Sequence, residues 1–324
     1  MNFQTVFFAH GKLRAVWRFL LSAAAMVVGI IAVQILLGFG FRLAGFKPSF
    51  LQANSLAAFV SIPALLGVVA LFTRVFEKQP VGSAGMALCG RWKSELAIGL
   101  AIGTAMMLAV AGAEWALDAA KFSWSGIPWV QLALWGCGGF AVMAFAATNE
   151  EIIFRGYPFQ RLVESIGAPG AILILSVLFG AIHLGNPNST WVGAVNTALV
   201  GIPFSIAYLR TRMLWLPIGM HFAWNFVQAF VLGLPVSGMT LPVSLLRAEA
   251  TGPEVVTGGA YGPEAGLLAT AVILLATGYL AVSRSIYVSE ESRALVLQPA
   301  GNLAPEAASL TLENRGPAGE NTAP

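Results

Sequence analysis

Long apolar segments that carry almost no charge determine what this chain can fold into. A helix that crosses a lipid bilayer needs about 17–25 predominantly apolar residues. Only 10% of the 324 residues are charged, against about 25% in soluble domains. We therefore predict an all-α fold, a polytopic transmembrane helix bundle of about eight spans. The predicted spans are 16–41, 52–73, 95–117, 129–155 or somewhat beyond, 169–184, 190–209, 213–233 and 264–283.

The basic residues predict how this bundle is oriented. Lys and Arg concentrate in the cytoplasmic loops of membrane proteins. With the N-terminus inside, all but four of the 18 Lys and Arg residues fall on the cytoplasmic side, the exceptions being Arg42, Lys47, Lys121 and Arg247. The N-terminus and the C-terminus are therefore both predicted to be cytoplasmic. The net charge of +3 reflects this loop bias, so we expect the lipid bilayer as a partner and no nucleic acid.

The first apolar segment and the two cysteines allow two further expectations. The apolar region of a cleavable signal is roughly 7–15 residues long, and 16–41 is far longer, so we expect it to be retained as a span. Cys89 falls in a predicted cytoplasmic loop and Cys137 in an apolar helix. Neither a disulfide nor a cysteine metal site is expected from this placement.

Three short patterns place ionisable residues inside the predicted spans. They are Glu150-Glu151-x-x-x-Arg155, Phe179-x-x-x-His183 and His221-x-x-x-Asn225. Such residues are costly in lipid and usually face one another, a cavity or a reaction. Glu151 and Arg155 have the spacing of a helical ion pair, and His221 and Asn225 share one helix face. A charge cluster that ends a span, or a satisfied core histidine, is the alternative interpretation.

The depths of these residues in the membrane agree. At about 1.5 Å per helical residue, Glu150 lies about 16 Å, His183 about 21 Å and His221 about 14 Å from the predicted cytoplasmic interface. With Asn225, they can occupy one slab of membrane, and we expect a site that opens towards the cytoplasm.

The chemistry of these groups indicates hydrolysis. A carboxylate and an imidazole around a cavity can activate water, and a second imidazole with an amide N–H can stabilise an oxyanion. Glu150, His183 and His221 could equally hold zinc with an open position for water. Asn225 is a poor zinc ligand and favours the oxyanion role, but the sequence leaves metal dependence open.

The three patterns, in this order on separate spans, resemble the CPBP intramembrane protease family. This family contains the type II CAAX prenyl endopeptidases and the bacterial Abi, bacteriocin-immunity and lysostaphin-resistance-like proteins. The resemblance covers roughly residues 128–230 and implies an intramembrane endopeptidase. It implies that Glu150 and His183 activate the hydrolytic water, that His221 and Asn225 hold the oxyanion, and that Glu151 and Arg155 support the site.

Four regions follow from these interpretations. We expect N-terminal transmembrane helices in 1–127, a protease-like catalytic core in 128–230, an extracytoplasmic loop and the last helix in 231–284, and a disordered cytoplasmic tail in 285–324. The sequence assigns no role to the Gly- and Pro-rich loop 234–263.

The sequence is compatible with more than one substrate and with or without a metal cofactor. The resemblance implies a membrane-linked peptide or protein substrate in the cell membrane, either prenylated, as for the eukaryotic members, or of another kind. No cofactor is expected with certainty, and zinc is the alternative. A proton-coupled transporter and a non-catalytic immunity scaffold are the rival functions, although a transporter predicts polar residues along a whole pathway, whereas here they form one cluster.

Overall fold

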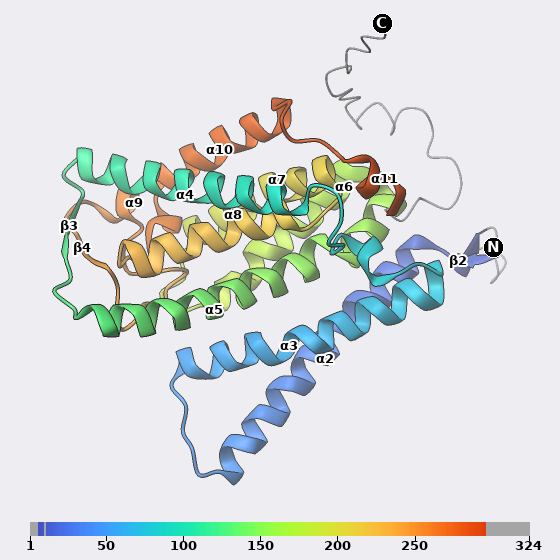
Figure 1. Ribbon diagram of the computed structural model, residues 1–324, viewed down its shortest axis with the longest axis horizontal. Helices are drawn as coiled ribbons and strands as arrows, with labels where there is room; N and C mark the ends of the chain where they lie inside the picture. The colour runs from blue at the N-terminus through green and yellow to red at the C-terminus, as the bar shows by residue number, and fades with distance from the viewer. Residues whose placement is uncertain (1–5, 10, 296–324) are drawn as a thin grey trace, which may run out of the picture.

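The computed structural model describes residues 6–9 and 11–295, and most of them form long helices that lie lengthwise in one bundle (Figure 1). The helices α2 and α3 form a hairpin along one side of this bundle, and α4, α5, α7, α8 and α10 run roughly along its length (Figure 1). The long helices are α2 (Ala15–Leu43), α3 (Phe50–Phe72), α4 (Trp92–Ala116), α5 (Trp129–Arg155), α6 (Tyr157–Ile182), α7 (Trp191–Thr211), α8 (Trp215–Phe226) and α10 (Leu267–Val282).

Helices cover each of the eight segments predicted from the sequence. Within the described residues, five helical stretches are long and apolar enough to cross a membrane, and one of them continues through both α5 and α6. The chain is thus a multi-pass membrane protein, while eight crossings and cytoplasmic termini stay predictions. The five stretches are Ala15–Leu43, Gln52–Glu77, Trp92–Ala116, Trp129–Gly185 and Trp191–Thr211.

Two short antiparallel strand pairs interrupt the predicted all-α fold. The pair β1 (Phe8–Ala9) and β2 (Lys12–Leu13) precedes α2. The strands β3 (Ala120–Trp124) and β4 (Leu246–Ala250) pair at the end of the bundle opposite the N-terminus (Figure 1). Phe122 in β3 and Leu246 in β4 pack against the buried core, so this pair closes that end of the bundle.

A glycine interrupts the helical backbone between α5 and α6, close to the predicted catalytic residue Glu150. A Cβ atom on Gly156 would lie 2.3 Å from the Ile152 carbonyl oxygen, so only glycine fits there. Pro158, a residue that kinks or ends a helix when it lies in the interior, lies in the first turn of α6, where its missing N–H costs little. A second break inside α6 occurs at Gly167, which has a φ of +81°.

Close backbone packing fixes α8, the helix that carries His221. A Cβ atom on Gly99 or Gly103 of α4 would lie 2.3 Å or 2.2 Å from the carbonyl oxygen of Leu216 or Met220. Because these glycines have no side chain, the α4 and α8 backbones touch directly. The helix that positions His221 is therefore held tightly along one face.

A buried ion cluster joins the α2–α3 hairpin to α6. Arg18 of α2 binds Glu77, in the π-helical turn Thr73–Glu77, and Glu164 of α6. Arg161 binds the same two carboxylates, at 3.2 Å and 2.5 Å. Both arginines are buried, so each charge is compensated inside the protein, as buried charges require.

The described part of the predicted disordered tail is ordered. Arg210 of α7 donates to the backbone oxygens of Ala281, Ser283 and Ile286, and Ile286 is buried. The helix α11 (Glu290–Leu295) follows. The prediction of disorder for 285–324 was wrong for 285–295, because composition does not reveal these anchoring contacts. Residues 296–324 lie outside the described residues. Cys89 and Cys137 are both free.

Candidate active site

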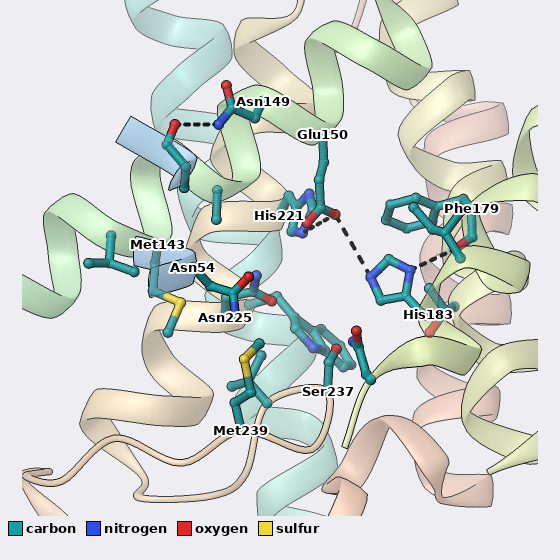
Figure 2. A pocket seen from close by; sticks show the side chains of 18 of the residues that line it. Asn54, Met143, Asn149, Glu150, Phe179, His183, His221, Asn225, Ser237 and Met239 are labelled. Atoms are coloured by element: carbon teal, nitrogen blue, oxygen red, sulfur yellow. Dashed lines mark hydrogen bonds and ion pairs between the residues drawn. The ribbon is translucent and has the colours of Figure 1, made fainter. Parts of the chain in front are cut away.

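The four predicted catalytic residues line one pocket of about 360 Å³ (Figure 2). Glu150 comes from α5, His183 from the end of α6, and His221 and Asn225 from α8. The structure thus brings together residues separated by up to 75 positions in the chain. Further lining residues come from α2, α3, α7 and the loop that follows α8.

Glu150 lies between the two histidine rings. Its Oε2 atom is 3.9 Å from His183 Nε2 and 3.7 Å from His221 Nε2. These distances exceed a direct hydrogen bond, and Oε2 has no hydrogen-bond partner among the described residues. The carboxylate therefore has free acceptor capacity at the point where both rings converge.

The opposite ring nitrogens of the two histidines are already engaged. Nδ1 of His183 lies 2.7 Å from the Phe179 carbonyl oxygen, and Nδ1 of His221 lies 2.9 Å from Glu151 Oε1. Because a carbonyl oxygen and an ionised carboxylate only accept hydrogen bonds, both contacts place a proton on Nδ1. In the neutral rings, Nε2 is then the unprotonated nitrogen that faces Glu150.

Glu151 is held in place by Arg155. Arg155 Nη1 donates to Glu151 Oε1 at 3.1 Å, and Nη2 donates to the Gly201 carbonyl oxygen at 3.2 Å. Both side chains are fully buried. The predicted ion pair between Glu151 and Arg155 is confirmed, and the structure adds that the same carboxylate holds His221.

Aromatic rings pack against both imidazoles. Phe204 of α7 stacks on His221, with 5.2 Å between ring centroids. Phe179 meets the His183 ring edge-on at 4.7 Å, and the Arg155 guanidinium lies 4.8 Å from the Phe179 centroid. Phe179 belongs to a pattern singled out in the sequence, whereas Phe204 has no local signal that distinguishes it from an ordinary apolar helix residue.

Asn149, the residue before Glu150, links the site to the α2–α3 hairpin through a hydrogen bond. Asn149 donates from Nδ2 to the carbonyl oxygen of Ala58 in α3. Asn149 and Glu150 both line the pocket, so this hydrogen bond links α3 to α5 at the site. Asn149 was not predicted from the sequence.

The residues of the pocket do not form an evident metal centre. Among the residues that the structure describes, no group of three or more His, Cys, Asp and Glu side chains could hold a metal ion. The zinc set of Glu150, His183 and His221 does not meet that condition. The mechanism proposed below therefore has no step that uses a metal.

The loop after α8 forms a wall of the pocket that sequence reasoning missed. Val236, Ser237, Met239, Thr240 and Leu241 line it, together with Glu264. These loop residues belong to the region 231–284, whose loop was predicted to be extracytoplasmic. The predicted opening towards the cytoplasm stays a prediction.

Comparison with known proteins identifies the same part of the chain. Residues 129–227 match the model of the type II CAAX prenyl endopeptidase Rce1-like family, and this segment contains all four predicted catalytic residues. The Bacillus subtilis (strain 168) protein named "Putative membrane peptidase YdiL" is 26% identical over an alignment of 254 residues, and the alignment covers 72% of this chain and 92% of that protein. Together with the three motifs, these similarities indicate a membrane peptidase that is related to the type II CAAX prenyl endopeptidases.

Proposed function

We propose that this protein is an intramembrane endopeptidase that hydrolyses a peptide bond with water activated by Glu150 and His183. The observation that carries the proposal is the convergence of both histidine Nε2 atoms on Glu150 Oε2, at 3.9 Å and 3.7 Å. With both Nδ1 atoms engaged elsewhere, the free nitrogens and the free carboxylate oxygen face one point in the pocket.

The nucleophile in this proposal is a water molecule bound between Glu150 and His183. The water donates one hydrogen bond to Glu150 Oε2 and the other to His183 Nε2. Its oxygen lone pair is then directed at the substrate, and Glu150 takes a proton as the oxygen attacks the peptide carbonyl carbon. The proton later passes from Glu150 to the leaving nitrogen as the C–N bond breaks, so that one water is consumed for each bond cut.

His221 and Asn225 stabilise the negative oxygen of the tetrahedral intermediate in this proposal. Because the Nδ1 proton of His221 is bound to Glu151, Nε2 can donate only when the ring carries both protons. The carboxylate of Glu151 is placed to stabilise that imidazolium. Asn225 lies one helical turn further along α8 and supplies an amide N–H to the same pocket. Preorganised donors of this kind contribute about 3–4 kcal/mol each.

The substrate of the proposed reaction is a peptide or protein linked to the membrane. The pocket lies within a bundle of apolar helices, so a substrate held in the bilayer can reach it without leaving the lipid. The matched family is named for CAAX prenyl endopeptidases, which makes a prenylated peptide the first probe to use. We further propose that the protein lies in the cell membrane.

Comparative proteomics of membrane fractions tests this function and does not require the substrate to be identified first. Cells that carry the wild type are compared with cells that carry Glu150→Gln, which keeps the side-chain shape and removes the base. Glu249→Gln, on the exposed strand β4, is the matched control. We expect new protein termini in wild-type and control membranes that are absent with Glu150→Gln. Identical termini in all three would favour the transporter or the non-catalytic scaffold.

A further inference from the structure

The loop between α8 and α10 enters the pocket beside the proposed active site. Its segment 236–241 contributes five lining residues, two of which, Met239 and Leu241, have large apolar side chains. In Figure 2, Met239 and Met143 lie on the Asn225 side of the pocket, away from His183. The ionisable groups Glu150 and His183 therefore lie apart from the two methionine side chains, which lie on the Asn225 side.

Hydrogen bonds from residues outside this segment hold it in place. Glu264 Oε2 accepts from the backbone N–H of Ser237 and, at 3.0 Å, from its hydroxyl. The backbone N–H of Gly238 donates to the Tyr261 carbonyl oxygen at 2.8 Å. Two successive residues of the segment are thus fixed by partners outside it.

The same segment lies directly against the turn that follows His183. Gly238 has a φ of +82°, and a Cβ atom there would lie 1.7 Å from the Pro187 carbonyl oxygen. Only glycine allows this conformation and this approach. The position of the loop and the position of the His183 turn are therefore mutually constrained.

Hydrogen bonds also fix the backbone at Glu264. Its backbone oxygen and that of Gly266 accept from Asn196 Nδ2 of α7, at 2.8 Å and 3.0 Å. Thr270 of α10 donates to Asn196 Oδ1 at 2.7 Å. The Glu264 side chain lines the pocket, and within the described residues no Lys, Arg or His forms a salt bridge with it. A carboxyl group removed from water needs hydrogen-bond partners, and Ser237 supplies two of them.

We propose that Glu264 is a positioning residue that holds the segment 236–241 in the pocket, so that Met239 and Leu241 form a subsite for an aliphatic side chain of the substrate next to the bond that is cut. This inference rests on the proposed peptidase function and deepens it. The thioether of Met239 is flexible and polarizable, so the subsite accepts large aliphatic side chains and gains little from Gly or Ala.

The substrate preference of subsite variants tests this proposal directly. The probes are prenyl-cysteine peptides in proteoliposomes, paired so that Leu or Ala occupies each of the three positions after the cysteine in turn. For one position, we expect wild-type kcat/KM to favour Leu by about tenfold or more, the range that a few methylene groups give in an apolar pocket. Met239→Ala and Leu241→Ala should reduce that ratio several-fold. Val255→Ala, at an exposed site in the short helix α9 (Glu254–Thr257) that does not line the pocket, should leave it unchanged.

Variants of Glu264 separate positioning from simple stability. Glu264→Gln keeps an oxygen that accepts from the Ser237 N–H, so it should retain the wild-type Leu preference. Glu264→Ala should lose the preference, with a larger change in KM than in kcat. Ser237→Ala, which removes only the hydroxyl bond, should fall between them. Glu254→Ala is the control, since Glu254 is exposed in the same loop.

The outcomes distinguish this inference from the proposed function. If the wild type cleaves the probes but the Leu preference is the same in Met239→Ala, Leu241→Ala and Glu264→Ala, the subsite is wrong and the peptidase stands. An equal loss in Glu264→Gln and Glu264→Ala would also overturn the positioning role. If the wild type cleaves no membrane-linked peptide, and its membrane proteome matches that of Glu150→Gln, the proposed function fails and the subsite with it.

Discussion

Nδ1 of His221 lies 2.9 Å from Glu151 Oε1, and both side chains are buried in the bundle. The same oxygen accepts a hydrogen bond from Arg155 Nη1 at 3.1 Å. The guanidinium of Arg155 and the imidazole of His221 therefore bind the same carboxylate oxygen. The sequence assigned Glu151 and Arg155 only a supporting role. In the structure, their contacts fix the orientation and the tautomer of His221.

Replacing Glu151 should separate orientation from stability. Glu151→Ala leaves Arg155 buried without its carboxylate, which should destabilise the fold by about 3–5 kcal/mol. Glu151→Gln keeps an acceptor for the His221 N–H and should fold, but it no longer supports an imidazolium, and activity should fall by about 100-fold or more. Thermal unfolding in detergent and peptide cleavage, measured on both variants, test this. A fully active Glu151→Gln protein would contradict the role.

The proposed protonation states predict a bell-shaped dependence of kcat/KM on pH. Glu150 must be ionised to accept a proton from water, so activity should fall as the pH decreases. His221 must carry its Nε2 proton to stabilise the oxyanion, so activity should also fall as the pH increases. In His221→Gln, the amide can donate but does not titrate over this range. Its residual activity should therefore lack the alkaline decline, and an unchanged alkaline limb would show that another group is responsible.

Metal removal distinguishes the two versions of the hydrolysis. No group of three candidate ligands in the described part of the chain could hold a metal, and the proposed mechanism needs none. We expect purified active protein to contain zinc well below one ion per chain and to keep its activity after dialysis against a chelator. Stoichiometric zinc that is lost together with activity, and restored with it, would establish the zinc-dependent version.

Cysteine labelling in intact cells tests the predicted orientation. Cys89 lies in the connection between α3 and α4, at the end predicted to be cytoplasmic. In a Cys137→Ser background, it should react only with a membrane-permeant maleimide. A cysteine introduced by Thr251→Cys beside β4, with Cys89 also replaced by Ser, should react with an impermeant reagent. The reverse pattern would place the termini outside.

The sequence was sufficient to locate the helices and to single out four residues that line one pocket. Charge is rare in this chain, so Glu150, His183 and His221 were conspicuous in apolar segments, and helical spacing paired Glu151 with Arg155 and His221 with Asn225. The break at Gly156 between α5 and α6 was not predicted, since the sequence does not reveal the conformation of a single glycine.

Other parts of the site depend on contacts between distant segments. Phe204 stacks on His221, yet it resembles many phenylalanines in apolar helices. Glu264 is a lone carboxyl near the start of a predicted span, and nothing local links it to Ser237. The loop was interpreted as irregular because Gly and Pro favour turns, whereas Gly238 permits a close approach to Pro187 that only the folded chain reveals.

The most direct test of the central claim is cleavage of a membrane-linked peptide by purified protein in proteoliposomes. The wild type, Glu150→Gln and the control Glu249→Gln are compared at equal amounts of folded protein, and mass spectrometry identifies the products. We predict one defined cut by the wild type and the control, with the rate in Glu150→Gln reduced by about 100-fold to 10,000-fold and its thermal stability unchanged. Cleavage by Glu150→Gln at the wild-type rate would contradict the account.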